Sequence, residues 1–162
     1  MDVRFIDTTI LANILDIPFM NQNRGQVIEE FKSLQKDENQ VLILPLATII
    51  ETGNHIAHIS DGNIRREKAK LMSEYLKNTA ENNAPWQYYG KELDKEDLIK
   101  LSIEFPDMAT REVGLGDLSI VRAYEKYKKS VPAIRNIMIW SLDNHLVSYK
   151  EEMKLPTRRR NL

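Results

Sequence analysis

The chain has 162 residues, of which 42% are hydrophobic and 29% are charged, a composition typical of globular proteins and not of disordered ones. Its 23 basic and 24 acidic residues give a formal net charge of −1. It therefore lacks the strongly basic balance of a dedicated nucleic-acid binder, and any nucleic acid must be bound through local patches or metal ions. Cysteine is absent, which excludes disulfides and Cys-ligated metal centres. No secretory leader or membrane-length apolar run is visible, so we expect a cytoplasmic protein without membrane association.

The first part of the chain alternates short apolar runs with amphipathic segments. Asp7, Thr8 and Thr9 suit the cap of a helix that follows the first strand. The run Val-Leu-Ile-Leu before Pro45 is typical of a strand buried on both faces of a parallel sheet. The elements expected here are a strand over Val3–Ile6, a helix to about Leu15, a helix over Arg24–Asp37, a strand over Gln40–Leu44 and a helix over Leu46–Ile59.

The rest of the chain continues the alternation with longer helices. The expected elements are a charged helix over Ile64–Asn82, a loop over Asn82–Gly90, a helix over Asp94–Ile103, an irregular stretch over Phe105–Gly116, a helix over Asp117–Lys128, a strand over Ile137–Leu142 that ends at Asp143, and a polar tail from Ser148. Helical spacing also predicts which side chains pack inward. They are Ile49, Ile50, Gly53, Ile56 and Ala57; Ala69, Met72, Tyr75 and Leu76; Ile120, Ala123, Tyr124 and Tyr127; and, in the first two helices, Leu11, Ile14, Leu15, Ile28 and Phe31.

No repeat or flexible linker divides the sequence, so we predict one domain over residues 1–162 with a basic tail at 154–162. Strands that alternate with helices indicate an α/β fold. We expect a three-layer sandwich in which helices flank a mostly parallel central sheet of about four or five strands.

Four acidic residues are predicted to meet at one edge of this sheet. Asp7 and Asp143 follow two buried strands, and ligands of parallel α/β sheets bind beyond the carboxyl ends of the strands. Glu51 lies about two turns into the helix after the second strand, and Asp117 opens a later helix. At an effective dielectric of about 20, two unit charges about 6 Å apart repel by roughly 3 kcal/mol, so such a cluster needs a cation.

All-oxygen ligands point to Mg²⁺ or Mn²⁺ more than to zinc, and such a site suits phosphodiester hydrolysis. Simpler roles stay open for each acid taken alone. Asp7 and Asp117 are also suited to be helix N-caps, and Glu51 to be a solvated helix residue.

Four segments of the sequence resemble the signature blocks of PIN domains, and they occur in that family's order between residues 4 and 149. They are FIDTTILANIL, LPLATIIETGNHIA, GLGDLSIVRAYEKY and IWSLDNHLVSY. The first block carries Asp followed by Thr or Ser, matched by Asp7 with Thr8 and Thr9. The helical Glu of the second block is matched by Glu51, and the Asp that opens a helix in the third by Asp117. In the fourth, an Asp preceded two positions earlier by Ser or Thr is matched by Ser141 and Asp143.

The resemblance implies a PIN-like fold and a Mg²⁺- or Mn²⁺-dependent endoribonuclease. Within the family the most common function is that of the toxin in a bacterial toxin–antitoxin pair of the VapC kind. The same resemblance implies RNA as substrate, an antitoxin protein as partner and a homodimer. The four acids would be the catalytic and metal-binding residues, supported by Thr8, Thr9 and Ser141.

Other residues carry weaker signals. His55 and His58 have the spacing of zinc ligands on a helix, although two ordinary histidines are the simpler interpretation. His145 lies two residues after Asp143 and is either a candidate for substrate contact or a simple turn residue. Arg65 and Arg66, with Lys68 and Lys70, form a basic patch at a helix start, which is either merely solvated or placed to meet a phosphate backbone.

Two further segments are open to a nucleic-acid role. Arg158, Arg159 and Arg160 form the densest basic run and are candidates for phosphate contact, or else a solvated tail. Trp86, Tyr88 and Tyr89 have the composition of a base-stacking loop, but packing against the core or a dimer partner is favoured.

Two alternative functions compete with the nuclease. Asp7 after a strand superficially fits an aspartyl-nucleophile phosphatase, but enzymes of the haloacid-dehalogenase kind have a second Asp where Thr9 stands. A catalytically silent PIN fold that serves as a scaffold or RNA-binding module is the other, although such a module has no reason to keep four mutually repelling acids.

Overall fold

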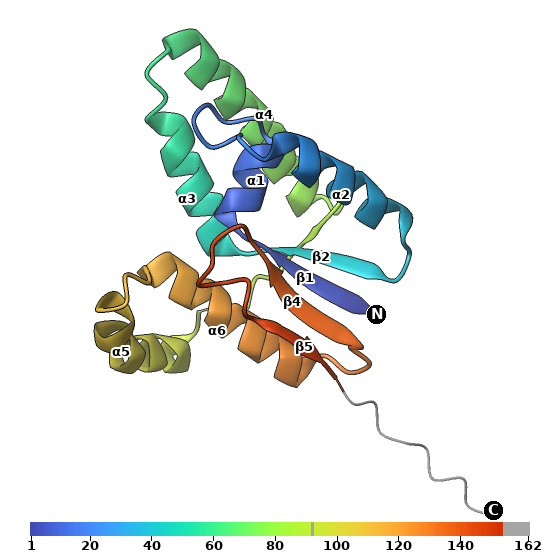
Figure 1. Cartoon of the computed structure of the whole chain (residues 1–162), viewed down its shortest axis with the longest axis vertical. Helices are drawn as coiled ribbons and strands as arrows, with labels where there is room; N and C mark the ends of the chain where they lie inside the picture. Colours follow the sequence, from blue (N-terminus) through green and yellow to red (C-terminus); the bar gives the residue numbers. More distant parts are fainter. Residues whose placement is uncertain (92, 154–162) are drawn as a thin grey trace, which may run out of the picture.

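A five-stranded sheet separates two groups of helices in the computed structural model, which describes residues 1–91 and 93–153 (Figure 1). The strands are β1 (Asp2–Ile6), β2 (Gln40–Leu44), β3 (Gln87–Tyr88), β4 (Asn136–Trp140) and β5 (Lys150–Glu152). The helices are α1 (Thr8–Ile14), α2 (Arg24–Lys36), α3 (Leu46–Ala57), α4 (Gly62–Ala80), α5 (Lys95–Ala109) and α6 (Leu115–Ser130).

The sheet has the order β3-β2-β1-β4-β5, with β1 at its centre. Strands β2 and β4 both run parallel to β1, and Val3 lies opposite Val41 on one side and Ile137 on the other. β3 is also parallel to β2, whereas β5 is antiparallel to β4 at the opposite edge. The mostly parallel sheet predicted from the sequence is therefore confirmed, and the carboxyl ends of β1, β2 and β4 face the same way.

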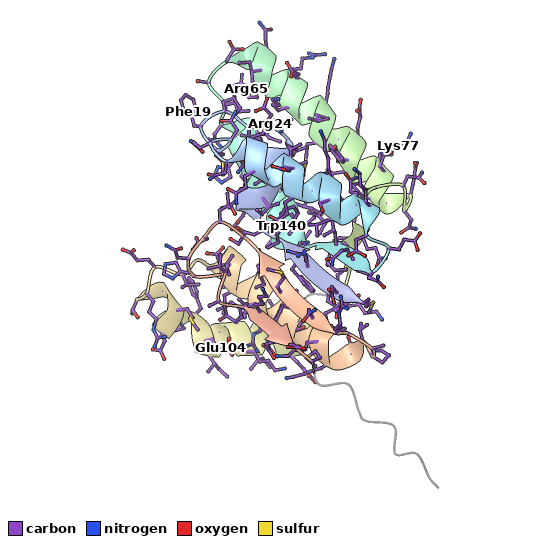
Figure 2. The ribbon with its side chains drawn as sticks, turned by 45° about the vertical axis from the view of Figure 1, so that its right-hand side comes forward. Phe19, Arg24, Arg65, Lys77, Glu104 and Trp140 are labelled. Atoms are coloured by element: carbon purple, nitrogen blue, oxygen red, sulfur yellow. The ribbon has the colours of Figure 1, made fainter. Side chains whose placement is uncertain are left out.

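Each face of the sheet has its own core. Ile6, Leu42 and Trp140 point to the side covered by α1, α2, α3 and α4, where they pack with side chains such as Phe31. Figure 2 labels Trp140 at the boundary between the sheet and α2; its indole N–H donates to Glu30 Oε2 at 3.2 Å. The opposite face packs mainly on α6, with α5 behind it (Figure 1). Its sheet residues are Val3, Phe5, Ile43, Ile137 and Ile139. The three-layer arrangement is thus confirmed.

Helix α5 differs from the prediction because it continues through Pro106 to Ala109, where an irregular stretch was expected. Two ion pairs hold it against α6: the Glu104 carboxylate pairs with Arg122 of α6 at 3.0 Å, and Asp97 pairs with Lys126 of α6 at 2.6 Å. Contacts between the helices therefore outweigh the local preference of proline against a helix interior.

The C-terminal part of the chain contains a strand that the sequence did not predict. β5 lies within the expected polar tail, and all three of its residues are exposed. It pairs with β4 through its backbone, so its side chains carry no periodic apolar signal. The two-residue strand β3 was likewise missed inside the predicted loop over Asn82–Gly90.

Two of the predicted inward faces were wrong in part. Ile50 and Ala57 are exposed, and the buried residues of α3 are Thr48, Thr52 and Ile56. On α4, Ala69 and Leu76 are exposed. Its buried residues are Lys68, Met72 and Thr79, because both polar side chains find partners there: Lys68 pairs with Asp16, and the Thr79 hydroxyl accepts the Trp86 N–H. The predicted faces of α6 and of the first two helices are confirmed, with Ile28 only partly buried.

The basic run Arg158–Arg160 and the rest of the predicted tail over 154–162 lie outside the described residues. Among the helices that are described, none is both long and apolar enough to cross a membrane.

Candidate active-site cleft

Asp7 stands where β1 ends and α1 begins. Its backbone N–H donates to the Trp140 carbonyl of β4 at 3.0 Å, which continues the strand pairing by one residue. Its extended backbone and its side chain make it the N-cap of α1, since Oδ2 accepts the Thr9 N–H at 3.3 Å. The simpler role considered for Asp7 is therefore real, and the same side chain lines the cleft described below.

Two hydroxyl groups hold the buried Asp7 carboxylate. Thr9 Oγ1 and Ser141 Oγ each donate to Asp7 Oδ2 at 2.7 Å. The same two oxygens accept backbone N–H groups of the segment after β4: Ser141 Oγ that of Asp143 at 2.9 Å, and Thr9 Oγ1 that of Leu142 at 3.0 Å. The hydroxyls thus join the start of α1 to the segment that carries Asp143.

Glu51 reaches the same place from α3. The Thr48 hydroxyl donates to the Ile6 carbonyl at 2.7 Å, which ties the first turn of α3 to the end of β1. Three residues later, Glu51 Oε2 accepts the Thr8 hydroxyl at 2.8 Å. Glu51 also lies against Gly116, where a Cβ atom would overlap its Oε1. A side chain at 116 would therefore displace the Glu51 carboxylate, whereas the φ angle of residue 116 is not positive and does not itself require glycine.

Asp117 lies in the first turn of α6, whose N-cap is Gly114, so the alternative role of Asp117 as an N-cap was wrong. Burial raises the pKa of its carboxyl to about 6, and repulsion by Asp7, Glu51 and Asp143 adds to this. His145 acts in the opposite direction. These effects outweigh the helix dipole, which favours a negative charge in a first turn.

Asp143 was predicted to follow its strand directly, and this was wrong: β4 ends at Trp140, and two residues lie between them. It lies in a turn in which its Oδ1 accepts the His145 N–H at 2.8 Å. His145 is exposed next to this turn, close enough to Asp117 to affect its pKa.

All four acids line one cleft of about 420 Å³. Thr8 and Thr9 line it too, together with Met20, Asn54 and His55, which the sequence did not single out for this place. Asn54 and His55 follow the helical Glu51 closely in the sequence, and this spacing could have identified them as cleft residues. His55 was considered only as a zinc ligand with His58, whose Nδ1 instead lies 2.7 Å from the Asn54 carbonyl.

The carboxylates suit a hard divalent cation by their chemistry, because each can offer oxygen. Within the described residues, Asp7 Oδ1 and the Asp117 carboxylate accept no hydrogen bond, so these oxygens stay free for a cation. As the side chains stand over residues 1–91 and 93–153, no group of three or more His, Asp or Glu forms a ready cation cage. A cation would therefore require small movements of the acids, with Asp7 and Glu51 already restrained by hydroxyls.

The basic patch predicted on the long helix does not line the cleft. Arg65 and Arg66 are exposed near the start of α4, and Arg65 donates to the Ile59 carbonyl at 3.0 Å. Lys68 is buried between Asp16 and Glu67, so it is not part of an open basic surface.

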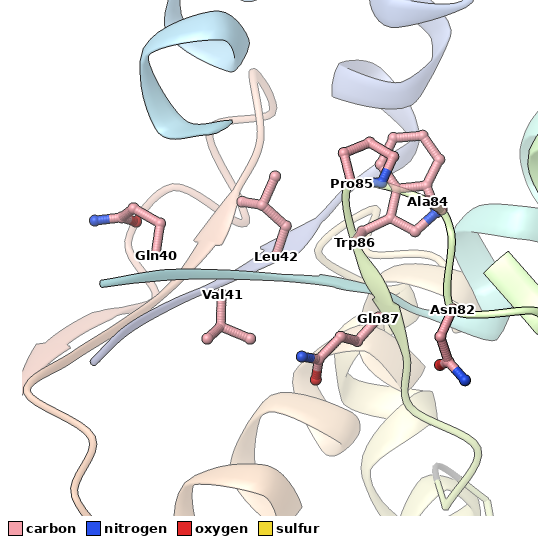
Figure 3. A pocket seen from close by; sticks show the side chains of 8 residues that line it. All are labelled: Gln40, Val41, Leu42, Asn82, Ala84, Pro85, Trp86 and Gln87. Atoms are coloured by element: carbon pink, nitrogen blue, oxygen red, sulfur yellow. The ribbon is translucent and has the colours of Figure 1, made fainter. Parts of the chain in front are cut away.

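The aromatic loop is largely part of the core. Trp86 is buried, stacks on Phe31 with 6.1 Å between ring centroids, and donates its N–H to the Thr79 hydroxyl at 2.9 Å. Tyr89 packs edge-on against Phe5 and Tyr127. A pocket of about 290 Å³ lies between this loop and β2, and its lining residues are all uncharged. Figure 3 shows their side chains. The favoured interpretation of the loop as a packing element agrees with these contacts for Trp86 and Tyr89.

No family model and no curated protein sequence matches the chain. Its structure is similar to a chain in the crystal structure of FitAcB from Neisseria gonorrhoeae, with a TM-score of 0.50 and 13% identity over 86% of this chain and 87% of that one. It is also similar to a chain of VapBC2 from Rickettsia felis bound to a DNA fragment from their promoter, with a TM-score of 0.48 and 11% identity over 86% of this chain and 99% of that one. At such low identity the likeness concerns the fold, which is a PIN-like α/β fold.

Proposed function

We propose that this chain is a divalent-metal-dependent endoribonuclease in which Asp7, Glu51, Asp117 and Asp143 hold Mg²⁺ or Mn²⁺. The observation that carries the proposal is the gathering of these four acids in one cleft, where burial and their repulsion raise the pKa of Asp117 to about 6. Such an arrangement is unfavourable without a cation, because like charges in a partly buried cleft repel. RNA as the substrate follows from the four sequence blocks that resemble PIN nucleases.

The residues around the acids have distinct tasks in this proposal. When bound, the cation would supply an activated water and stabilise negative charge on the phosphate oxygens. Thr9 and Ser141 fix the Asp7 carboxylate, and Thr8 fixes that of Glu51, so both need little reordering. His55 at the cleft and His145 beside it offer N–H donors to a phosphate backbone that the acids themselves would repel.

The test compares single acids inside and outside the cleft. Asp143→Asn and Asp117→Asn should each lower the cleavage rate of single-stranded RNA in Mn²⁺ by about a hundredfold or more, as expected when charge stabilisation in the transition state is lost. Asp107→Asn, an exposed acid on α5, is the matched control and should keep full activity. Mn²⁺ should raise the melting temperature of the wild type, and the rise should shrink in both cleft variants. Full activity in both cleft variants would contradict the assignment.

We further propose, from the VapC-like resemblance, that the chain is a toxin which forms a homodimer and is silenced by an antitoxin protein. The PIN-like fold supports this only at the level of architecture. Expression of the wild type alone should arrest bacterial growth, and Asp7→Asn at the same protein level should not. Equal growth would exclude a toxin and would leave the nuclease proposal standing.

The two competing functions have specific arguments against them. Enzymes with an aspartyl nucleophile of the haloacid-dehalogenase kind have a second Asp where Thr9 stands, and the Thr9 hydroxyl instead donates to Asp7 Oδ2 at 2.7 Å. Failure to trap a phosphoaspartate would exclude that phosphatase. A silent module has no need of a cation, so a melting temperature that does not respond to Mn²⁺ would favour it.

A further inference from the structure

Phe19, in the segment between α1 and α2, is the most exposed of the large hydrophobic side chains in the described part of the chain. Its exposed fraction is 88%, so it contributes almost nothing to either core. Its φ angle is 66°, in the left-handed region that bulky side chains rarely adopt because of steric cost. Neither burial nor backbone preference explains a phenylalanine at this position.

The segment that presents Phe19 is fixed at several points. Asp16, also at a positive φ of 57°, accepts a hydrogen bond from the Asn21 amide at 2.8 Å and pairs with Lys68 of α4 at 3.7 Å. The Gln22 amide donates to the Phe19 carbonyl at 2.6 Å, and the Met20 N–H donates to the Ile17 carbonyl at 3.0 Å. The ring is therefore held out toward solvent by a tied backbone, and strained residues that are held in this way gather at functional sites.

The position of the segment relates Phe19 to the acid cleft. Met20, the next residue, lines the cleft together with Asn54 and His55. The pair between Asp16 and Lys68 also brings the start of α4 to this segment, and Arg65 lies one turn before Lys68. Figure 2 labels Phe19 and Arg65 in the same part of the molecule. A strand leaving the cleft past Met20 would thus reach the segment that carries the exposed ring of Phe19.

We propose that Phe19 stacks on an unpaired base of the RNA strand whose phosphate lies in the acid cleft, so that it positions the strand one or two nucleotides from the cleaved bond. This inference rests on the proposed nuclease function. An exposed aromatic ring beside a phosphate site is how single-strand binders hold RNA without reading its sequence, because every base has a flat face to stack on.

The test uses four variants of the full chain and a 12-nucleotide single-stranded RNA in Mn²⁺. Phe19→Ala should raise KM about tenfold, the effect of losing one base–aromatic stack, while kcat changes little. Phe19→Trp should retain the wild-type KM, and Phe19→Leu should resemble Phe19→Ala because it keeps apolar area without a flat ring. Ile103→Ala is the matched control: this side chain is 70% exposed on α5, away from the cleft, and KM should not change.

A second measurement identifies the base. Oligonucleotides with one abasic position, placed in turn on either side of the cleaved bond, should show a single position where wild-type KM rises about tenfold. In Phe19→Ala that position should no longer matter. Phe19→Gly should melt at a higher temperature than the wild type, because glycine relieves the left-handed strain and no burial is lost.

The proposal is overturned if Phe19→Ala cleaves RNA with the wild-type KM, or if Phe19→Leu does so. The second result would show that apolar area is what counts, as for docking of a protein partner. No cleavage by any variant, the wild type included, would instead contradict the proposed function itself.

Discussion

The cleft has two halves that are built differently. Asp7 and Glu51 are restrained: three donors reach Asp7 Oδ2, and Thr8 donates to Glu51, which also lies against Gly116. The other half is open. In the described residues no group donates to the Asp117 carboxylate, and the Asp143 carboxylate accepts only the backbone N–H of His145.

The two halves should therefore respond differently to mutation, because hydrogen bonds dominate one half and charge repulsion the other. The restrained half fixes two carboxylates through contacts that also stabilise the fold, so changes there should lower the free energy of unfolding. The open half carries an electrostatic cost, seen in the raised pKa of Asp117, so removing its charge should stabilise the metal-free protein. The predictions below test this contrast by urea unfolding in EDTA, where no divalent cation contributes.

Ser141→Ala is expected to have the largest effect. It removes a donor from a buried carboxylate and leaves the Asp143 N–H without its acceptor, which should cost about 2–3 kcal/mol of unfolding free energy. Ser102→Ala, on the exposed surface of α5, removes a hydroxyl that bonds only its own helix and should change stability by less than about 0.5 kcal/mol. If the two variants unfold at the same urea concentration, the restrained half is not a stabilising element.

Gly116→Ala should cost about 0.5–1 kcal/mol, because the new methyl group would displace the end of the flexible Glu51 side chain and break its bond to Thr8, while the gain in helix propensity offsets part of this loss. It should also reduce RNA cleavage, since Glu51 loses its place. Gly53→Ala, where a methyl group meets no atom within 4 Å, is the control on α3. It should gain up to about 1 kcal/mol from helix propensity. A neutral Gly116→Ala would mean that Glu51 has room elsewhere.

Asp117→Asn should raise the unfolding free energy at pH 7.5 by about 1 kcal/mol, after allowance for solvent screening. The sign follows from the pKa of about 6 in the folded state against 3.8 as the ordinary value. Between these values the folded chain binds more protons than the unfolded one, so wild-type stability falls as pH rises from about 4 to about 6. The gain should therefore be much smaller at pH 4 than at pH 7.5, and it should vanish only well below 3.8, where the carboxyl is protonated in both states. A loss at pH 7.5 would contradict an open, repulsive half.

The parts of the fold that could be predicted are those in which apolar residues form a continuous run or recur at helical spacing. β2 was predicted with its bounds, and α6 with its inward face, because both are patterned by burial. β5 has no such pattern: its side chains are exposed, and only its backbone joins the sheet. The helix predicted over Asp94–Ile103 was too short, because α5 is held by the ion pairs of Glu104 and Asp97 with α6, and such contacts are not visible in the pattern of the segment itself.

The four acids of the site could be predicted from the sequence, but the contacts that hold them in place could not. Strand ends and block order were enough to select Asp7, Glu51, Asp117 and Asp143 as candidates. The close approach of Glu51 to Gly116 joins two helices far apart in sequence, so spacing could not reveal it. Phe19 was missed for another reason. It stands out by its exposure and its positive φ angle, and neither can be seen in the amino-acid sequence.

The central position of β1 has a consequence for the order in which the protein folds during its synthesis. β1 is made before its neighbour β4, which pairs with it only after more than a hundred further residues have been synthesised, and Ser141 lies 134 residues after Asp7. Contacts so distant in sequence form late, because the loop they close is costly in entropy. On the ribosome, the chain therefore carries Asp7 and Glu51 for some time before Asp143 has been made. If the protein cleaves RNA, that order of assembly keeps a growing chain harmless to the messenger from which it is being read.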